Sequence, residues 1–190
     1  KKWNGKKENI DFVVSDAESF HFDDYFDVIT CQYALFFFPN SQKVLRNLWK
    51  LEKKGGTLAI TVHGLKTKVP FFSSILDAVT KFIPDYIPPD SPDLDRFGTK
   101  KALIQEVKKA GFSKIQINEL KLSYSPGTFE EYWKNYLKYI AKPLKEKLDT
   151  LTKKQKSEVK KLAKENTKQF TKRDGKIVFP WQVLILTARK

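Results

Sequence analysis

The sequence predicts a single α/β domain built on a mostly parallel sheet. Its 190 residues suffice for one hydrophobic core, and 41% hydrophobic with 31% charged residues is typical of a globular chain. Short β-branched runs at 10–14, 26–30 and 57–62 have the length and composition of buried strands. A helical pattern separates the last two runs, and this strand–helix–strand unit favours parallel pairing with helices on both faces.

The core elements follow in order. Ser41 is a candidate cap for a helix that runs to about Glu52, with one apolar face of Val44, Leu45, Leu48 and Leu51. A second helix is expected over 100–110, opened by Thr99 and ended by Gly111. The alternation over 115–122 predicts a strand, and the apolar run over 179–188 predicts the closing strand.

Two insertions interrupt this core. Residues 65–97 contain a helical pattern over 71–82 and then a proline-rich loop. Residues 123–176 contain two capping boxes, at Thr128 with Glu131 and at Thr152 with Gln155, each of which opens a helix. The sequence therefore predicts one domain over 1–190, with a core of 10–64, 98–122 and 177–190 and helical cap insertions of 65–97 and 123–176.

The net charge of +14 is unevenly distributed. Residues 125–190 carry 17 basic and 7 acidic side chains, and most of the excess lies in a lysine-rich segment with a single arginine, Arg173. We expect this segment to be a solvated helix face, because arginine is favoured where phosphates or bases are recognised specifically. Binding to RNA or to an anionic surface is the alternative.

Composition excludes several other classes. Cys31 is the only cysteine, so neither an internal disulfide nor a cysteine-rich zinc site is possible, and we expect no metal site and a cytoplasmic location. No stretch approaches the roughly 18 uncharged apolar residues of a membrane span, and the first residues do not form a secretory signal.

An acidic motif follows the first predicted strand. Ser15-Asp16-Ala17-Glu18 lies where open α/β sheets bind ligands, at the carboxyl end of a strand. There the Asp16 carboxylate is able to accept a hydrogen bond from an exocyclic amine or a ribose hydroxyl. The alternative is that Asp16 caps its own loop.

The wider pattern from Val14 to Val62 resembles the second half of a known fold. Ser15–Phe22 matches the stretch after the third strand, Phe26-Asp27 opens the fourth, and Leu51–Gly56 matches the turn before the fifth. Lys109-Ala110-Gly111-Phe112 matches the end of a later helix. Together they resemble the Rossmann-like core of class I S-adenosylmethionine-dependent methyltransferases, in the small-molecule group that includes the quinone-biosynthesis enzymes.

The resemblance implies S-adenosylmethionine as cofactor and assigns residues to it. Asp16 would bond the adenine amino group, Ala17 would offer its backbone amide to the ring, and Phe20 would pack on the adenine. Flanking the methionine part would be three residues that follow the next strand, Cys31, Gln32 and Tyr33.

Two parts of the family pattern are absent from the sequence. These are the Gly-x-Gly-x-Gly loop after strand one and the acidic residue that ends strand two. We expect them to lie upstream of Lys1, so that the N-terminal strands are missing and this chain is the C-terminal two-thirds of the enzyme. The alternative is a cofactor-less relative that serves as an interaction module.

The candidate reaction site lies beside the cofactor residues. His63 ends a strand and is a candidate general base, with an exposed loop histidine as the alternative. Phe36, Phe37, Tyr132 and Tyr136 are expected to wall a pocket for a small, partly apolar organic substrate. Methyl transfer from a sulfonium depends mainly on positioning and desolvation, so a base is not obligatory.

Overall fold

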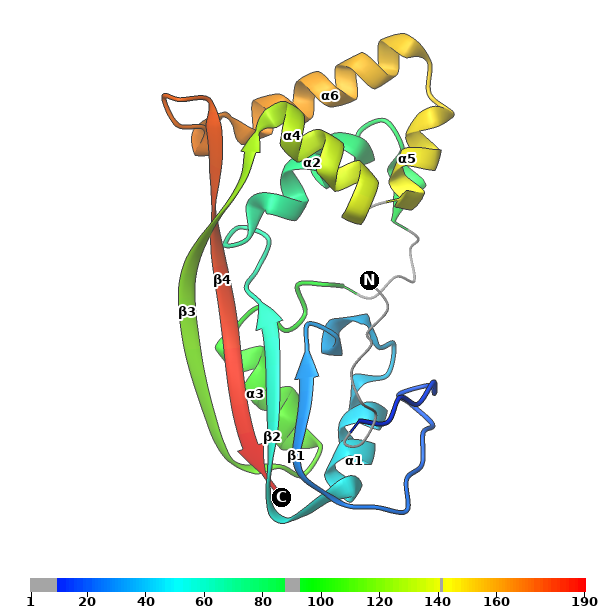
Figure 1. Cartoon of the computed structure of the whole chain (residues 1–190), viewed down its shortest axis with the longest axis vertical. Coiled ribbons are helices and arrows are strands. Elements are labelled where there is room, and N and C mark those ends of the chain that lie inside the picture. The colour runs from blue at the N-terminus through cyan, green and yellow to red at the C-terminus, as the bar shows by residue number, and fades with distance from the viewer. Residues whose placement is uncertain (1–9, 88–92, 141) are drawn as a thin grey trace.

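The computed structural model describes residues 10–87, 93–140 and 142–190 (Figure 1). The four strands are β1 (Phe26–Gln32), β2 (Glu52–His63), β3 (Ser113–Thr128) and β4 (Lys176–Arg189). The α-helices are α1 (Ser41–Leu51), α2 (Pro70–Thr80), α3 (Lys100–Lys109), α4 (Phe129–Asn135), α5 (Lys142–Asp149) and α6 (Lys153–Thr167). Shorter helical turns are η1 (Leu35–Phe37), η2 (Pro84–Tyr86), η3 (Tyr136–Ile140) and η4 (Lys168–Phe170).

The sheet has the order β1-β2-β4-β3. Strands β1 and β2 are parallel, as the strand–helix–strand unit predicts, whereas β4 is antiparallel to both β2 and β3. The α/β class is confirmed, but the expectation of a mostly parallel sheet is wrong for the described residues. The reason is that β3 leads away from the core and β4 returns along it as a hairpin partner.

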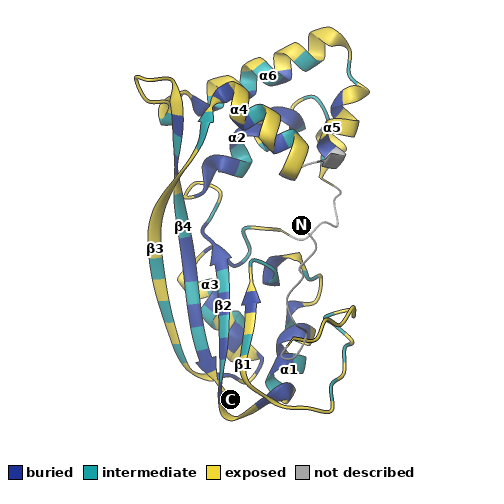
Figure 2. Ribbon diagram, in the orientation of Figure 1, coloured by how far each residue is buried: buried dark blue, intermediate teal, exposed yellow. Residues whose placement is uncertain are grey.

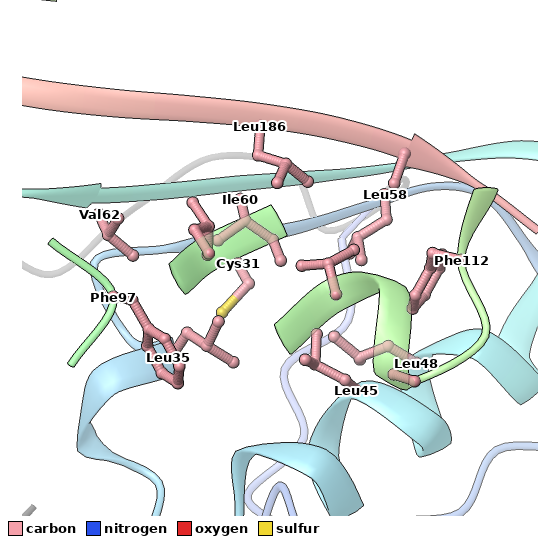
Figure 3. Close-up of a cluster of buried hydrophobic side chains, with 14 of the residues drawn as sticks. Cys31, Leu35, Leu45, Leu48, Leu58, Ile60, Val62, Phe97, Phe112 and Leu186 are labelled. Atoms are coloured by element: carbon pink, nitrogen blue, oxygen red, sulfur yellow. The ribbon is translucent and has the colours of Figure 1, made fainter. Parts of the chain in front are cut away.

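One hydrophobic cluster, called the core below, holds the sheet to its helices. Alternate residues of β2 (Leu58, Ile60 and Val62) pack with side chains of α1 and α3, which therefore cover the same face (Figure 3). The apolar spacing of α1 predicted this burial, and Thr99 caps α3 as expected by accepting a hydrogen bond from the Ala102 amide at 3.2 Å. The cap residue of α1 is Asn40 rather than Ser41.

A second cluster, called the cap below, joins α2, α4, α5 and α6 to the far ends of β3 and β4. Both strands are longer than the sequence predicts, because pairs such as Tyr124 with Phe179 and Gly127 with Ile177 continue the hairpin beyond the core. Ile177 and Phe179, within the range expected for the core, pack in the cap instead. Both predicted capping boxes are present.

The second face of the sheet and the edge of β1 are exposed. Val28, on the outer strand β1, is 61% exposed, and Leu120 and Leu122 of β3 are exposed on the same face. Figure 2 shows β2 and β4 largely buried between these two exposed strands. The expectation of helices on both faces is therefore wrong for the described part of the chain.

The predicted strand over 10–14 is not formed. Its apolar side chains Phe12, Val13 and Val14 are exposed, and β1 pairs only with β2 among the described residues. A β-branched run favours extended backbone, but a strand also needs a neighbour to take its hydrogen bonds. None of the described strand pairings includes this segment.

Candidate active site

The carboxyl ends of the parallel strands β1 and β2 lie side by side. Gln32 is in register with Thr61, and the Tyr33 amide donates to the Thr61 carbonyl at 2.9 Å. Tyr33 has a φ angle of 50°, in the left-handed region that non-glycine residues seldom occupy. Such strain persists only where the surroundings impose it and is concentrated at functional sites.

His63 lies at this edge and is buried, with 8% of its surface exposed, so it is not an exposed loop histidine. Its ring centroid is 4.6 Å from that of Phe36, in η1 of the core, and 5.9 Å from that of Phe72, in α2 of the cap. Its Nδ1 lies 2.8 Å from the Gly64 carbonyl oxygen, so Nδ1 carries the hydrogen in the neutral ring. Nε2 is then the nitrogen that is able to accept a proton.

Cys31 is a core residue. Its side chain lies among Leu35, Ile60 and other apolar residues (Figure 3), and burial raises the pKa of its thiol. The amides of Leu35 and Ala34 hydrogen-bond to the sulfur and lower this pKa in part. The thiol is therefore unreactive, and only the backbone of Cys31 is available to the edge. Gln32, the next residue, is exposed.

The Asp16 turn is attached to α1. Asp16 is exposed, and its Oδ1 accepts from the Glu18 amide at 2.9 Å, so the side chain does cap its own turn. Glu18 in turn accepts from the Asn40 amide at 2.8 Å and, through its carbonyl, from the Asn47 side chain at 3.0 Å. Ala17 and Phe20 pack partly buried against the core. None of the described hydrogen bonds of this turn joins it to Gln32 or Tyr33 at the end of β1.

The four expected pocket residues separate into different environments. Phe36 is buried beside His63, whereas Phe37 is 58% exposed. Tyr132 and Tyr136 are buried in the cap, where desolvation raises the pKa of both phenols, and the Tyr132 hydroxyl donates to the Phe71 carbonyl. These two tyrosines pack the cap interior, and its link to His63 runs through neighbouring rings, from Phe71 to Phe72.

Two residues near the edge were not identified as site residues from sequence, and a third, Phe72, was grouped only with the aromatic residues of the insertions. Phe72 packs on His63, and Arg96 donates from one guanidinium nitrogen to the carbonyls of Leu35 (3.1 Å) and Phe38. Gly98 lies so close to the start of the first insertion that a Cβ there would be 2.7 Å from the Leu65 nitrogen. No local pattern marks these positions, because each depends on contact between the insertion and the core.

The described residues contain no group of three or more His, Cys, Asp or Glu side chains arranged to hold a metal ion. Among the described helices, none is both long enough and apolar enough to cross a bilayer.

Known proteins with similar sequences are methyltransferases. Residues 1–60 match the family model described as a methyltransferase domain. The chain is 34% identical over 84 residues to the ubiquinone/menaquinone biosynthesis C-methyltransferase UbiE of Vibrio campbellii, covering 44% of this chain and 29% of that protein. It is 36% identical over 76 residues to the enzyme of the same name from Vibrio parahaemolyticus, covering 40% and 29%. The matched part thus spans about three-tenths of these relatives.

Two solved structures share the fold. BH2331 of Bacillus halodurans, described as a candidate methyltransferase, has a TM-score of 0.58 at 19% identity, covering 95% of this chain and 78% of that one. YcgJ of Bacillus subtilis has a TM-score of 0.57 at 17% identity, covering 96% and 72%. At these identities the likeness shows the fold alone.

The sequence matches are to a methyltransferase domain and to two C-methyltransferases, and the solved structures share the fold. This similarity to class I S-adenosylmethionine-dependent methyltransferases of the quinone-biosynthesis type confirms the predicted resemblance.

The described residues fit one side of a cofactor site. The strained Tyr33, the exposed Gln32 and the α1-bound turn of Asp16 are polar or backbone groups beside the carboxyl edge. A glycine-rich loop for the other side is absent from the sequence, and the edge of β1 toward which it would approach is exposed.

Proposed function

We propose that the protein to which this chain belongs transfers the methyl group of S-adenosylmethionine to a small, partly apolar organic acceptor. The observation that carries the proposal is the position of His63. It lies at the carboxyl edge of two parallel strands, wedged between a core ring and a cap ring, in a chain related to methyltransferases. The bound cofactor would supply an electrophilic methyl group there, and the aromatic surroundings exclude water from an apolar acceptor.

The chain would supply one part of the cofactor site. Asp16, Ala17 and Phe20 would take the adenine, and Gln32 and Tyr33, with the Cys31 backbone, would flank the methionine part. The exposed edge of β1 supports the proposal that further strands and a glycine-rich loop come from a longer chain, of which this is the C-terminal two-thirds. The single buried cysteine supports a cytoplasmic location.

Isothermal titration with S-adenosylmethionine and its demethylated product tests the cofactor proposal. The longer gene product is expected to bind both compounds, and the 190-residue chain to bind them far more weakly. The absence of heat with the longer protein would remove the enzyme hypothesis. Equal affinity of the two proteins would instead show that this chain holds a complete site.

Variants of Asp16 test its adenine role within that titration. Asp16→Ala is expected to weaken binding by the longer protein about tenfold or more, because it removes a charged acceptor. Asp24→Ala is the matched control, since Asp24 is an exposed carboxylate before β1. An equal loss of cofactor affinity in both variants would mean that Asp16 acts only through the net charge of the protein and not through contact with the adenine.

His63 is assigned the role of proton acceptor through Nε2. In the longer protein, His63→Gln is expected to lower kcat about a hundredfold or more while KM changes little. His21→Gln is the control, because the other histidine is exposed and shares none of the described contacts of His63. An unchanged kcat would reduce His63 to a packing residue and leave positioning as the source of catalysis.

A further inference from the structure

The outermost helix of the cap, α6, carries a face made almost entirely of lysine. At 100° per residue, six lysines and Ser157 occupy a continuous arc of about 120°. These lysines are Lys153, Lys154, Lys160, Lys161, Lys164 and Lys168. The opposite side, which contains Val159 and Ala163, packs into the cap. Figure 1 shows α6 running along the end of the molecule farthest from the core.

Most of this charge is not neutralised. Lys160, at one border of the arc, pairs with Glu130 at 2.6 Å, and Lys168, which follows α6 in η4, pairs with Glu165 at 2.7 Å. Among the described residues, no carboxylate lies within ion-pair distance of Lys153, Lys154, Lys161 or Lys164. The two glutamates of α6 itself, Glu158 and Glu165, lie outside the arc. We call the four unpaired lysines the α6 lysine face.

The chemistry of this face distinguishes between anionic partners. It has no aromatic side chain on which a base could stack and no arginine for bidentate contacts to bases or phosphates. A row of mobile ammonium groups suits a fluid surface whose charges rearrange to meet it. Lys161 and Lys164 also line a cleft of about 390 Å³. Glu130 and Glu165 line the same cleft, so the outward surface of the helix, rather than the cleft, is the part suited to anionic headgroups.

We propose that the α6 lysine face docks the cap on the surface of an anionic phospholipid bilayer. The contact is peripheral and electrostatic, since the arc contains no apolar side chain to insert. It does not depend on the proposed methyl transfer, and it places the exposed end of the cap, rather than the sheet, against the lipid.

Vesicle sedimentation tests the proposal with the chain itself. We expect binding to mixed phosphatidylglycerol and phosphatidylcholine vesicles, little binding to phosphatidylcholine alone, and a steep loss as salt is raised. Replacing Lys153, Lys154, Lys161 and Lys164 by glutamine should weaken binding to the anionic vesicles by about several hundredfold, at roughly fivefold for each lysine.

A matched variant removes the same charge elsewhere. Lys43 of α1 and Lys101, Lys108 and Lys109 of α3 are exposed lysines of the core, and their replacement by glutamine should weaken binding less than about fivefold. Circular dichroism melts establish that both variants are folded. Equal losses in the two variants, or equal binding to neutral vesicles, would overturn the proposal. Tighter binding to mixed-sequence RNA than to anionic vesicles at the same salt would also overturn it, in favour of a nucleic-acid partner.

Discussion

The core and the cap bury their side chains in different ways. The cap surrounds its cluster with four helices and a hairpin end, and Phe71 alone contacts six other aromatic rings. The core covers one face of its sheet with two helices and leaves the other face and the β1 edge exposed. The cap is thus a closed unit, whereas the core is covered on one face only. The apolar segment over 10–14 belongs to this incompletely covered region and does not form a strand there.

The largest effect is expected from truncating the centre of the cap. Phe71→Ala should lower the free energy of unfolding by about 3–5 kcal/mol, because the buried ring leaves a cavity among its neighbours. Tyr124→Ala is the control, since Tyr124 contacts Phe71 but is about half exposed, and it should cost about 1 kcal/mol. Urea unfolding followed by tryptophan fluorescence measures both. If Phe71→Ala shifts only the first of two unfolding transitions, the cap and the core unfold separately. A single shifted transition would show that the two regions unfold together despite their different packing.

The junction between the two regions gives the next largest effect. A Cβ on Gly98 would lie 2.7 Å from the Leu65 backbone nitrogen, which has no room to move. Gly98→Ala should therefore cost about 2–3 kcal/mol. At Gly64 the added Cβ meets the side chain of Gln182, whose amide end is able to rotate away although its Cβ remains 3.0 Å from the added atom. Gly64→Ala should therefore cost less, about 1–2 kcal/mol. Equal losses of unfolding free energy at the two positions would mean that the backbone at the junction moves to accommodate the added Cβ.

Much of the fold was predictable, and the failures have a common cause. The helix α1 and both capping boxes follow from patterns within a few residues, and such patterns act before any tertiary contact forms. The strand over 10–14 was predicted wrongly because its formation depends on a partner strand. The end of β3 was missed because Pro126-Gly127 is typical of a turn, yet a register shift with a positive φ at Gly127 lets pairing with β4 continue.

For the candidate site, too, local features were predicted correctly and contacts between distant segments were not. Sequence placed His63 at a strand end, which the structure confirms, because strand ends are local features. It did not identify Arg96 or the contact of Phe72 with His63, because both depend on the first insertion folding back onto the core. It placed Tyr132 in a pocket wall, although the ring is buried in the cap, because helical spacing shows which residues share a face but not what that face meets.

A pH-dependent effect is expected at the other end of the core. Glu52 is fully buried, and its Oε2 is without a partner among the described residues, while Oε1 accepts from the Lys190 amide at 3.0 Å. Burial raises the pKa of Glu52, so its protonated form favours folding at low pH and this contribution is lost as the pH rises through the folded-state pKa. Glu52→Gln cannot ionise and should raise stability at neutral pH by about 1–2 kcal/mol. Unfolding free energies measured from pH 4 to pH 8, roughly the range in which carboxyls titrate, should converge with those of the wild type at the acid end. A difference that does not vary with pH would exclude ionisation as the cause.

The smallest effect is expected from removing the N-terminal capping residue of one helix in each region. The Thr152 hydroxyl accepts from the Gln155 amide at 3.3 Å in a full capping box at the start of α6, whereas Thr99 accepts from the Ala102 amide at 3.2 Å at the start of α3. Each change to alanine should cost about 1 kcal/mol or less, with the larger loss at Thr152 because its box satisfies two amides. If the cap folds as a unit of its own, Thr152→Ala lowers the same transition as Phe71→Ala, and Thr99→Ala lowers the other. Alternatively, both variants lower the stability of one shared transition, each by its own free-energy cost. That result would show that the long β3–β4 hairpin couples the closed cap to the half-covered core.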